Sequence, residues 1–182
     1  FMKVAVIVGT RPEIIRLSAV ICALEKSDAF ELELIHTGQN YDFELNEIFF
    51  DDMSVSHPKH FLKAAGENAI ETIANILVNS HRVLKSIKPD CCLILGDTNS
   101  CLAAYPAKRL RIPVFHMEAG NRCFDNRVPE ELNRKMVDHM ADITMPYSDI
   151  AREYLLREGC APDTIVKTYS PMFEVLERLR PK

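Results

Sequence analysis

The sequence has no long hydrophobic run and no excess of basic residues, and these absences exclude two classes of partner. No apolar segment approaches the roughly 18 residues that a transmembrane helix needs, so we expect no membrane partner. Lysine and arginine number 22 against 26 aspartates and glutamates, which gives a formal net charge of −4. Proteins that bind nucleic acid usually carry a basic surface, so we expect no nucleic-acid partner either.

Motifs for two common cofactor sites are also missing. The sequence contains no Cys-x-x-Cys pair and no cysteine–histidine ligand spacing, so we predict no metal site. The turn Gly9–Glu13 reads GTRPE, which is not the Gly-x-Gly-x-x-Gly fingerprint of dinucleotide-binding folds. This argues against a dinucleotide-dependent redox enzyme, and we predict no cofactor.

The six cysteines occur in patterns that favour free thiols over disulfides. Cys22, Cys91, Cys92 and Cys101 lie in apolar strand or helix patterns, where a free thiol behaves as a small hydrophobic group. The adjacent pair Cys91 and Cys92 would point to opposite faces of a strand. The N-terminal run Lys3–Val8 is typical of a strand and has no signal-peptide layout. We therefore predict a reduced, cytoplasmic protein.

Apolar runs of strand length alternate with helical patterns along the chain. Its 182 residues are enough for one domain with a sizeable core and few for two. The alternation predicts an α/β fold with a doubly wound, mostly parallel, Rossmann-like sheet. The predicted strands are Lys3–Val8, Glu31–His36, His60–Leu62, Cys91–Leu95, Pro113–Glu118, Ile143–Met145 and Ile165–Thr168. The predicted helices are Pro12–Lys26, Asp42–Phe50, Glu67–Ile87, Thr98–Leu110, Pro129–Met140, Ser148–Glu158 and Pro171–Arg180.

Acidic side chains follow two successive predicted strands. Asp97 comes just after Cys91–Leu95, Glu118 ends Pro113–Glu118, and Glu130 begins the next helix. Because the carboxyl ends of parallel strands open onto one crevice, we expect these acids to converge there. Carboxylates gathered in a cleft can exchange protons with a substrate. The sequence therefore predicts a proton-transferring enzyme site, or half of one.

Each of these acids also has a structural interpretation. Asp97 can cap the helix that follows it, and Glu130 and Glu131 can complement a helix dipole. Glu118 is harder to explain in this way, because it ends a buried strand where an apolar or turn-forming residue would be ordinary. Burial there would raise its pKa towards neutrality, as a general acid or base requires.

Polar turns follow the first and second predicted strands. Thr10 and Glu13 form the pattern of a capping box. Arg11 places a fixed cation at the start of that helix, which suits phosphate or sugar oxygens, and this segment alone supports the structural and the binding interpretation equally. Gln39 lies in a turn for which a structural role is favoured in isolation. Its place after a strand makes it a candidate ligand contact.

Two histidines and a polar pair accompany the acids. His116 lies inside a predicted strand and His139 inside a helix, and such residues are more often satisfied structural histidines than catalysts. Asn133 and Arg134 lie one helical turn from Glu130, so they can pair with it or brace it.

Taken together, these segments resemble the non-hydrolysing UDP-N-acetylglucosamine 2-epimerase family. A single motif of this kind would be weakly specific, whereas these occur in the family's order across nearly the whole chain. The block from residue 121 to residue 146 is most similar to a branch that acts on 6-deoxy sugars and makes UDP-N-acetyl-L-fucosamine for surface polysaccharide. The matching segments are Gly9–Ile15, Thr37–Gln39, Gly96–Thr98, His116–Arg122, Pro129–Arg134 and Ser170–Met172.

The resemblance implies a fold, a reaction and a set of site residues. The fold would be one half of a glycosyltransferase-B-like pair of Rossmann-like domains, with the active site between them. The reaction would invert C2 of the sugar without NAD or metal, by elimination of UDP to a glycal and its re-addition. The carboxylates that move the proton would be Asp97, Glu118 and Glu130. The UDP-sugar would be bound by Arg11, Gln39 and Arg122.

Two departures from the family pattern shape the domain prediction. Chains of the family are about twice this length, and their second half carries most UDP contacts and a catalytic histidine. Residues 1–169 would thus form the N-terminal domain and residues 170–182 the start of the crossover helix, so that the isolated chain would be inactive and the full-length protein a homodimer. Tyr169 stands where the family usually has glycine, a residue that permits a tight turn.

Two other functions remain open at this point. A glycosyltransferase of the same architecture would transfer the sugar to an acceptor instead of returning UDP to it. A non-catalytic module would bind a nucleotide sugar without chemistry.

Overall fold

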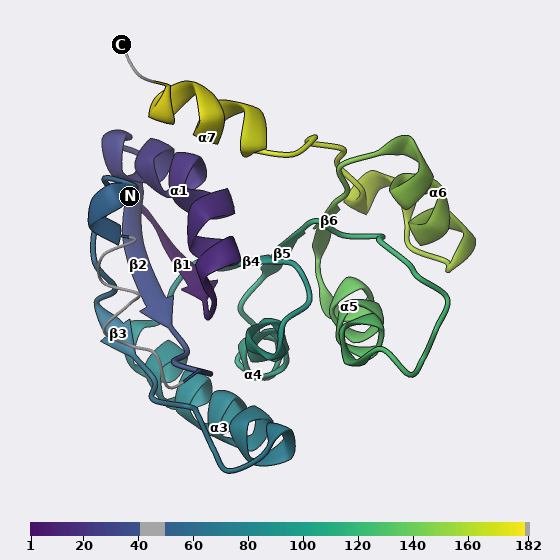
Figure 1. The fold of residues 1–182 in the computed structure, drawn as a ribbon, viewed down its shortest axis with the longest axis horizontal. Coiled ribbons are helices and arrows are strands. Elements are labelled where there is room, and N and C mark those ends of the chain that lie inside the picture. The colour runs from purple at the N-terminus through teal and green to yellow at the C-terminus, as the bar shows by residue number, and fades with distance from the viewer. Residues whose placement is uncertain (41–49, 181–182) are drawn as a thin grey trace.

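The computed structural model describes residues 1–40 and 50–180, and six parallel strands form its central sheet (Figure 1). The strand order is β3-β2-β1-β4-β5-β6, and every pair of neighbours is parallel. This confirms the predicted α/β class with a doubly wound parallel sheet. The strands are β1 Met2–Val8, β2 Phe30–His36, β3 His60–Phe61, β4 Cys91–Leu95, β5 Val114–Met117 and β6 Ile143–Met145.

Helices cover both faces of the sheet, because alternate residues of a strand point to opposite sides. From β1, Val4, Val6 and Val8 pack in one apolar cluster with α1, and Ala5 and Ile7 pack in another with α3, α4 and α5. At the C-terminal end, α7 lies beside α1 (Figure 1). The helices are α1 Arg11–Lys26, α3 Ala69–Ile87, α4 Ala104–Arg109, α5 Pro129–Met140, α6 Asp149–Arg157 and α7 Met172–Leu179, with short 3-10 turns η1 Asn99–Ala103 and η2 Pro162–Thr164.

The strand order reverses direction between β1 and β4. From β1 the chain proceeds through β2 to β3 at one edge, and then returns to β4 and proceeds through β5 to β6 at the other. In open parallel sheets, ligands bind outside the carboxyl ends of the strands at such a switch point. The turns Gly9–Glu13 and Gly96–Thr98 follow β1 and β4, so both lie at this place.

Two predicted elements take a different form. The predicted strand Ile165–Thr168 is wrong, since only Ile165 makes an isolated bridge, to Thr144. Thr168 N–H still donates to the carbonyl of Pro146, but proline has no N–H to return a bond, so the ladder ends there. The predicted helix Thr98–Leu110 is split into the 3-10 turn η1 and the short helix α4.

The predicted helix Asp42–Phe50 lies outside the described residues except for Phe50. Tyr169 takes the left-handed conformation, with φ of 61°, so the turn before α7 keeps the geometry that a glycine would allow. Within the described part of the chain, no helix combines the length and apolar character needed to cross a bilayer.

Candidate active site

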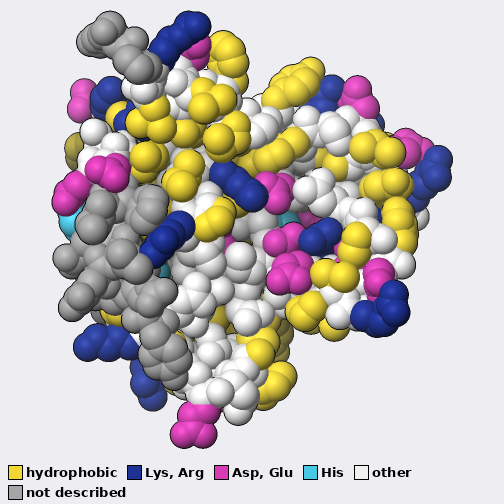
Figure 2. Space-filling view, in the orientation of Figure 1, with side chains coloured by type: hydrophobic (Ala, Val, Ile, Leu, Met, Phe, Trp, Pro, Cys, Tyr) yellow, Lys and Arg dark blue, Asp and Glu magenta, His cyan; other side chains and the backbone are white. Residues whose placement is uncertain are grey.

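The loops after β4 and β5 bring two of the predicted acids to neighbouring positions. Leu95 at the end of β4 is in register with Met117 at the end of β5, so Asp97 and Glu118 follow adjacent strand ends. An added Cβ at Gly96 would lie 3.9 Å from Glu118 Oε1, which places that carboxylate over the end of β4. Figure 2 shows acidic and basic side chains together near the middle of this face, between the α1 side and the α5 side.

The carboxylate of Glu118 is held by a cation from across the switch point. Arg16 Nη1, on α1, donates to Glu118 Oε2 at 2.6 Å. The backbone of Glu118 has a φ of 60°, a left-handed conformation that costs a non-glycine residue roughly 1–2 kcal/mol. Backbone strain of this kind clusters at functional sites, where the surrounding structure enforces it.

Asp97 is half-buried and contacts the first turns of α5. Arg134 Nη2 lies 2.8 Å from Asp97 Oδ2, and Asn133 Nδ2 donates to the Asp97 carbonyl at 2.9 Å. Burial raises the pKa of Asp97 above its ordinary value; Arg134 opposes this, and the negative charge of Glu130 reinforces it. A carboxyl whose pKa is displaced towards neutrality is suited to exchange a proton near physiological pH.

The two adjacent glutamates at the start of α5 differ in environment. Glu130 is exposed, whereas Glu131 is buried. Although burial raises the pKa of Glu131, the N–H groups of Cys123 and Phe124, both 3.1 Å from its carboxylate, and the charge of Arg134 bring it below its ordinary value. The structural interpretation therefore fits Glu131, and Glu130 is the one that faces solvent near Asp97. Arg134 pairs with Asp97 and Glu131, where the sequence pattern predicted a partnership with Glu130.

The predicted contacts on the other side of the switch point lie at the ends of β1 and β2. Arg11 is half-buried at the first position of α1. The side-chain carbonyl of Gln39 accepts from Ser100 N–H at 3.0 Å, and the Thr98 hydroxyl oxygen lies 3.3 Å from it. Gln39 thus fixes the start of η1 next to Asp97.

Glu13 is a functional candidate that the sequence pattern presented only as a capping residue. It is buried, and its Oε2 accepts from Gly9 N–H at 2.5 Å and from Thr10 N–H at 3.2 Å. Thr98 also donates to its carboxylate. Burial raises the pKa of Glu13 to about 7, an effect that these three hydrogen bonds reduce and the charge of Asp97 increases. Nothing in the spacing alone distinguishes this group from an ordinary capping box.

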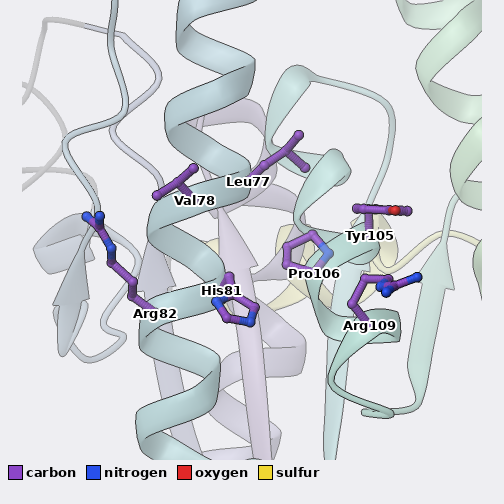
Figure 3. Close-up of a pocket in the computed structure, with 7 residues that line it drawn as sticks. All are labelled: Leu77, Val78, His81, Arg82, Tyr105, Pro106 and Arg109. Carbon is purple, nitrogen blue, oxygen red and sulfur yellow. The ribbon is translucent and has the colours of Figure 1, made fainter.

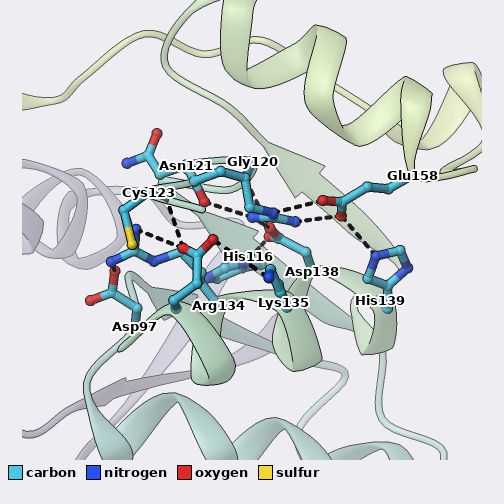
Figure 4. A network of polar contacts seen from close by, with 12 residues as sticks. Asp97, His116, Gly120, Asn121, Cys123, Arg134, Lys135, Asp138, His139 and Glu158 are labelled. Carbon is cyan, nitrogen blue, oxygen red and sulfur yellow. Dashed lines mark hydrogen bonds and ion pairs between the residues drawn. The ribbon is translucent and has the colours of Figure 1, made fainter. Parts of the chain in front are cut away.

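Arg122 belongs to a largely buried ion-pair network, and Figure 4 labels its partners Asp138 and Glu158 together with His139. Its guanidinium contacts the Asp138 carboxylate at 2.7 Å and the Glu158 carboxylate at 2.6 Å, and its side chain has no exposed surface. His139 also contacts Glu158, at 2.9 Å. These contacts give Arg122 a structural role, and its predicted contact with substrate stays a prediction.

Two other residues near the acids carry polar groups. His116 is fully buried with a hydrogen bond at each ring nitrogen, as expected for a satisfied structural histidine. Tyr147 has a buried hydroxyl without a hydrogen-bond partner among the described residues. Burial raises the pKa of that hydroxyl, and the charge of Glu118 raises it further. The sequence pattern gave no reason to single out Tyr147.

Two apolar hollows lie elsewhere on the molecule and do not contain the converging acids. One, of about 300 Å³, lies between α3 and α4 and is lined by residues such as Leu77, Val78 and Tyr105 (Figure 3). The other, of about 480 Å³, lies between α1 and the segment leading to α7 and includes Val20 and Met145. Among the described residues no group of three or more histidine, cysteine or acidic side chains is arranged to hold a metal ion.

The family model of the UDP-N-acetylglucosamine 2-epimerases matches residues 22–182. The chain belongs to the UDP-N-acetylglucosamine 2-epimerase family. The match includes the segments that carry Gln39, Asp97, Glu118, Arg122 and Glu130, and only Arg11 of the predicted site residues precedes it.

Solved and curated members of the epimerase family resemble this chain over about half of their own length. The UDP-N-acetylglucosamine 2-epimerase of Rickettsia bellii superposes with a TM-score of 0.90 and 49% identity, covering 97% of this chain and 47% of that one. The Methanocaldococcus jannaschii enzyme in complex with UDP-GlcNAc and UDP superposes with a TM-score of 0.92 and 37% identity, covering 97% and 49%. The UDP-2,3-diacetamido-2,3-dideoxy-D-glucuronate 2-epimerase of Pseudomonas aeruginosa is 36% identical over 159 residues, covering 87% and 45%. The chain thus has the fold of one half of a glycosyltransferase-B-like epimerase.

Proposed function

We propose that the protein containing this chain is a 2-epimerase of UDP-N-acetylhexosamines and that Asp97, Glu118 and Glu130 carry its proton transfers. The observation that carries the proposal is the placement of Asp97 and Glu118 at adjacent strand ends. Glu130 lies close enough for its negative charge to raise the pKa of Asp97. This arrangement occurs at the switch point of a chain that belongs to the epimerase family.

The proposed reaction needs only proton transfer and a leaving group. A carboxylate removes the proton at C2, the C2–H electron pair forms the C1–C2 double bond of a glycal, and the C1–O bond breaks with its electrons on the diphosphate of UDP. In the second half, the diphosphate oxygen adds back to C1 while a carboxylic acid delivers a proton to the opposite face of C2. No hydride is transferred, so the overall change is an inversion without net oxidation.

Cations at the switch point are placed to favour the charged species of this reaction. Arg16 orients Glu118, and Arg134 orients Asp97. We propose that Arg11, at the N-terminus of α1, binds diphosphate or sugar oxygens, since helix N-termini favour anions. We also propose that Gln39 and Arg122 bind the substrate. For Arg122 to do so, its guanidinium would have to release its ion pairs with Asp138 and Glu158.

The second wall of the site would come from a second domain. The chain spans about half the length of its relatives. We propose that residues 1–169 form one domain, that residues 170–182 begin the crossover, and that the isolated chain is inactive. We also propose that the full-length protein is a homodimer, which light scattering of the complete gene product would test.

The sugar itself is a finer proposal. The relatives named above act on different 2-acetamido sugars, GlcNAc in two cases and a diacetamido uronate in the third. We propose a 6-deoxy substrate whose epimer is UDP-N-acetyl-L-fucosamine, used for surface polysaccharide. A panel of UDP-N-acetylhexosamines with and without the 6-hydroxyl tests this choice, and a higher kcat/KM for a 6-hydroxylated sugar would overturn it.

The deciding experiment is hydrogen exchange at C2. The full-length protein is incubated with a UDP-N-acetylhexosamine in deuterated water, and proton NMR follows deuterium at C2 and the appearance of the epimer. Exchange with epimer formation supports the proposal. Transfer of the sugar to an acceptor without exchange would identify a glycosyltransferase, and binding without either reaction would identify a non-catalytic module.

A further inference from the structure

His116 lies on β5, two residues before Glu118, and makes a hydrogen bond at each of its ring nitrogens. It is fully buried. Its Nδ1 lies 2.7 Å from Asp138 Oδ1 on α5, and its Nε2 lies 2.7 Å from the carbonyl oxygen of Gly96. Figure 4 shows His116 next to Asp138 within this network.

The identity of these partners fixes where the ring protons are. A backbone carbonyl can only accept a hydrogen bond, so Nε2 of His116 must donate to Gly96. The other carboxylate oxygen of Asp138 already accepts from Gly120 N–H at 3.0 Å and from Arg122 Nη1 at 2.7 Å. Two donors on one carboxyl group, one of them a charged guanidinium, favour its ionised form, which is an acceptor only. Nδ1 of His116 must then donate as well, and the ring carries both protons.

The charges of the buried network agree with a protonated ring. His116 contacts Asp138, Asp138 contacts Arg122, and Arg122 contacts Glu158. The side chains of the first three have no exposed surface. Buried charges are tolerated when they are paired. With His116 protonated, positive and negative groups alternate along the network and balance.

The same pair of residues fixes both strand ends that carry the proposed acids. The His116 ring holds the carbonyl of Gly96, the residue before Asp97, and Asp138 holds the N–H of Gly120, two residues after Glu118. We propose that His116, as a doubly protonated imidazole paired with Asp138, is a positioning residue that sets Asp97 against Glu118. This inference rests on the proposed function only for the consequence of that positioning, since the state of the ring is a property of the fold.

The state of the ring is tested without any substrate. Nitrogen-15 NMR of the histidine-labelled full-length protein at neutral pH distinguishes protonated from unprotonated ring nitrogens, and the signals of His116 are assigned by their loss in His116→Asn. We expect both nitrogens of His116 to be protonated. A signal from one unprotonated nitrogen would overturn the proposal whatever the enzyme does.

Kinetics test the positioning role. Neither asparagine nor glutamine can donate to Gly96 and Asp138 in the geometry of the ring, so His116→Asn and His116→Gln should lower kcat for epimerisation by about 100-fold, as small misplacements of reacting groups do, and leave KM within about twofold. His81, a histidine of α3 that lines the hollow between α3 and α4 (Figure 3), supplies the control: His81→Gln should keep the wild-type kcat. Folded His116 variants with wild-type kcat, or with a raised KM alone, would overturn the positioning role.

If the substitutions prevent folding, Asp138→Asn serves as a second test, because it keeps an acceptor but removes the charge. It should show the same loss of kcat, and an unchanged kcat would again overturn the positioning role. Lack of epimerisation by the wild-type protein would instead count against the proposed function.

Discussion

The guanidinium of Arg16 lies 2.6 Å from the carboxylate of Glu118, although 102 residues separate them in the sequence. Arg16 belongs to α1, which follows β1, whereas Glu118 follows β5. The pair therefore spans the switch point of the sheet and joins its two halves at the proposed site. Glu118 also has the strained backbone of the left-handed region, so its carboxylate is fixed both by its own turn and by a distant cation.

Loss of the Arg16 charge should impair the reaction more than the fold. We expect Arg16→Met to lower the rate of C2 exchange by about tenfold or more, because Glu118 loses the group that orients it. The free energy of unfolding should change by no more than about 1 kcal/mol, since the Arg16 side chain is partly exposed. Exchange kinetics and urea unfolding measure the two effects. Arg157→Met, which removes an exposed ion pair on α6, is the control, and equal rates in both variants would contradict the prediction.

The three proposed catalytic carboxylates should each be required. Asp97→Asn, Glu118→Gln and Glu130→Gln keep the shape of the side chain but remove its ability to take a proton. We expect each to lower C2 exchange by about 100-fold or more, the lower end of what general acid–base catalysis supplies. Asp163 is an exposed acid of η2, and Asp163→Asn, the control, should leave the rate of C2 exchange unchanged. Full activity of Glu130→Gln would mean that Glu130 takes no part in the proton transfers and only complements the dipole of α5.

The architecture could be predicted from the sequence because its signals are local. Strand-length apolar runs separated by helical patterns determine the α/β class, and the strand ends determine where Asp97 and Glu118 lie. The break between η1 and α4 was not predicted, and the contact at the start of η1, where Ser100 N–H donates to the side chain of Gln39, comes from a distant part of the sequence. The pairing at Ile165 ends early because the neighbouring segment has a proline, Pro146. The apolar pattern of residues 165–168 therefore could not reveal it.

Partners within the site were less predictable than positions. Helical spacing predicted that Arg134 pairs with Glu130 or braces it, whereas its partners are Asp97, 2.8 Å away on another element, and Glu131. Glu13 satisfied the rule for a capping box, yet its burial and its contact with Thr98 depend on the packing of α1 against β4. In both cases the missing information is tertiary, because burial and long-range charge determine a pKa and spacing does not.

The buried guanidinium of Arg122 should matter for stability. Arg122→Met removes one of the two cationic partners of the buried Asp138, leaving only His116, and removes the main cause that lowers the pKa of Glu158 to about 2. We expect the free energy of unfolding to fall by about 3–5 kcal/mol, the usual cost of breaking a buried pair. Because a lowered carboxyl pKa stabilises the fold above the ordinary value of 4.5, the wild-type protein should lose this contribution as pH falls from there towards 2, and the variant should lose less.

Urea unfolding of Arg122→Met across this acid range measures both effects. Arg127→Met is the control, since Arg127 pairs with Asp125 through a side chain that is 91% exposed, and its unfolding should be unchanged. A stable Arg122→Met protein with a raised KM would show instead that the guanidinium serves substrate binding.

Glu13 should make the protein less stable as pH rises towards neutrality. Its pKa is about 7 in the folded state against an ordinary value of 4.5, so the folded protein binds a proton more tightly than the unfolded chain between these values. Stability therefore falls as pH rises through this range, by an amount on the order of 3 kcal/mol at about 1.4 kcal/mol per pH unit. Glu13→Gln should lack this loss. Its amide carbonyl can still accept from Gly9 and Thr10, and its NH2 can donate to the Thr98 hydroxyl, which is then free to donate to Gln39.

The difference in unfolding free energy between Glu13→Gln and the wild type should consequently be small at pH 4.5 and should favour the variant increasingly up to about pH 7. Urea unfolding at the two ends of that range measures it. Glu25→Gln, on the exposed side of α1, gives the pH dependence that an unburied glutamate contributes. Parallel stability curves for Glu13→Gln and the wild type would mean that Glu13 is ionised when folded, and the carboxylate would then add a fixed negative charge beside Asp97.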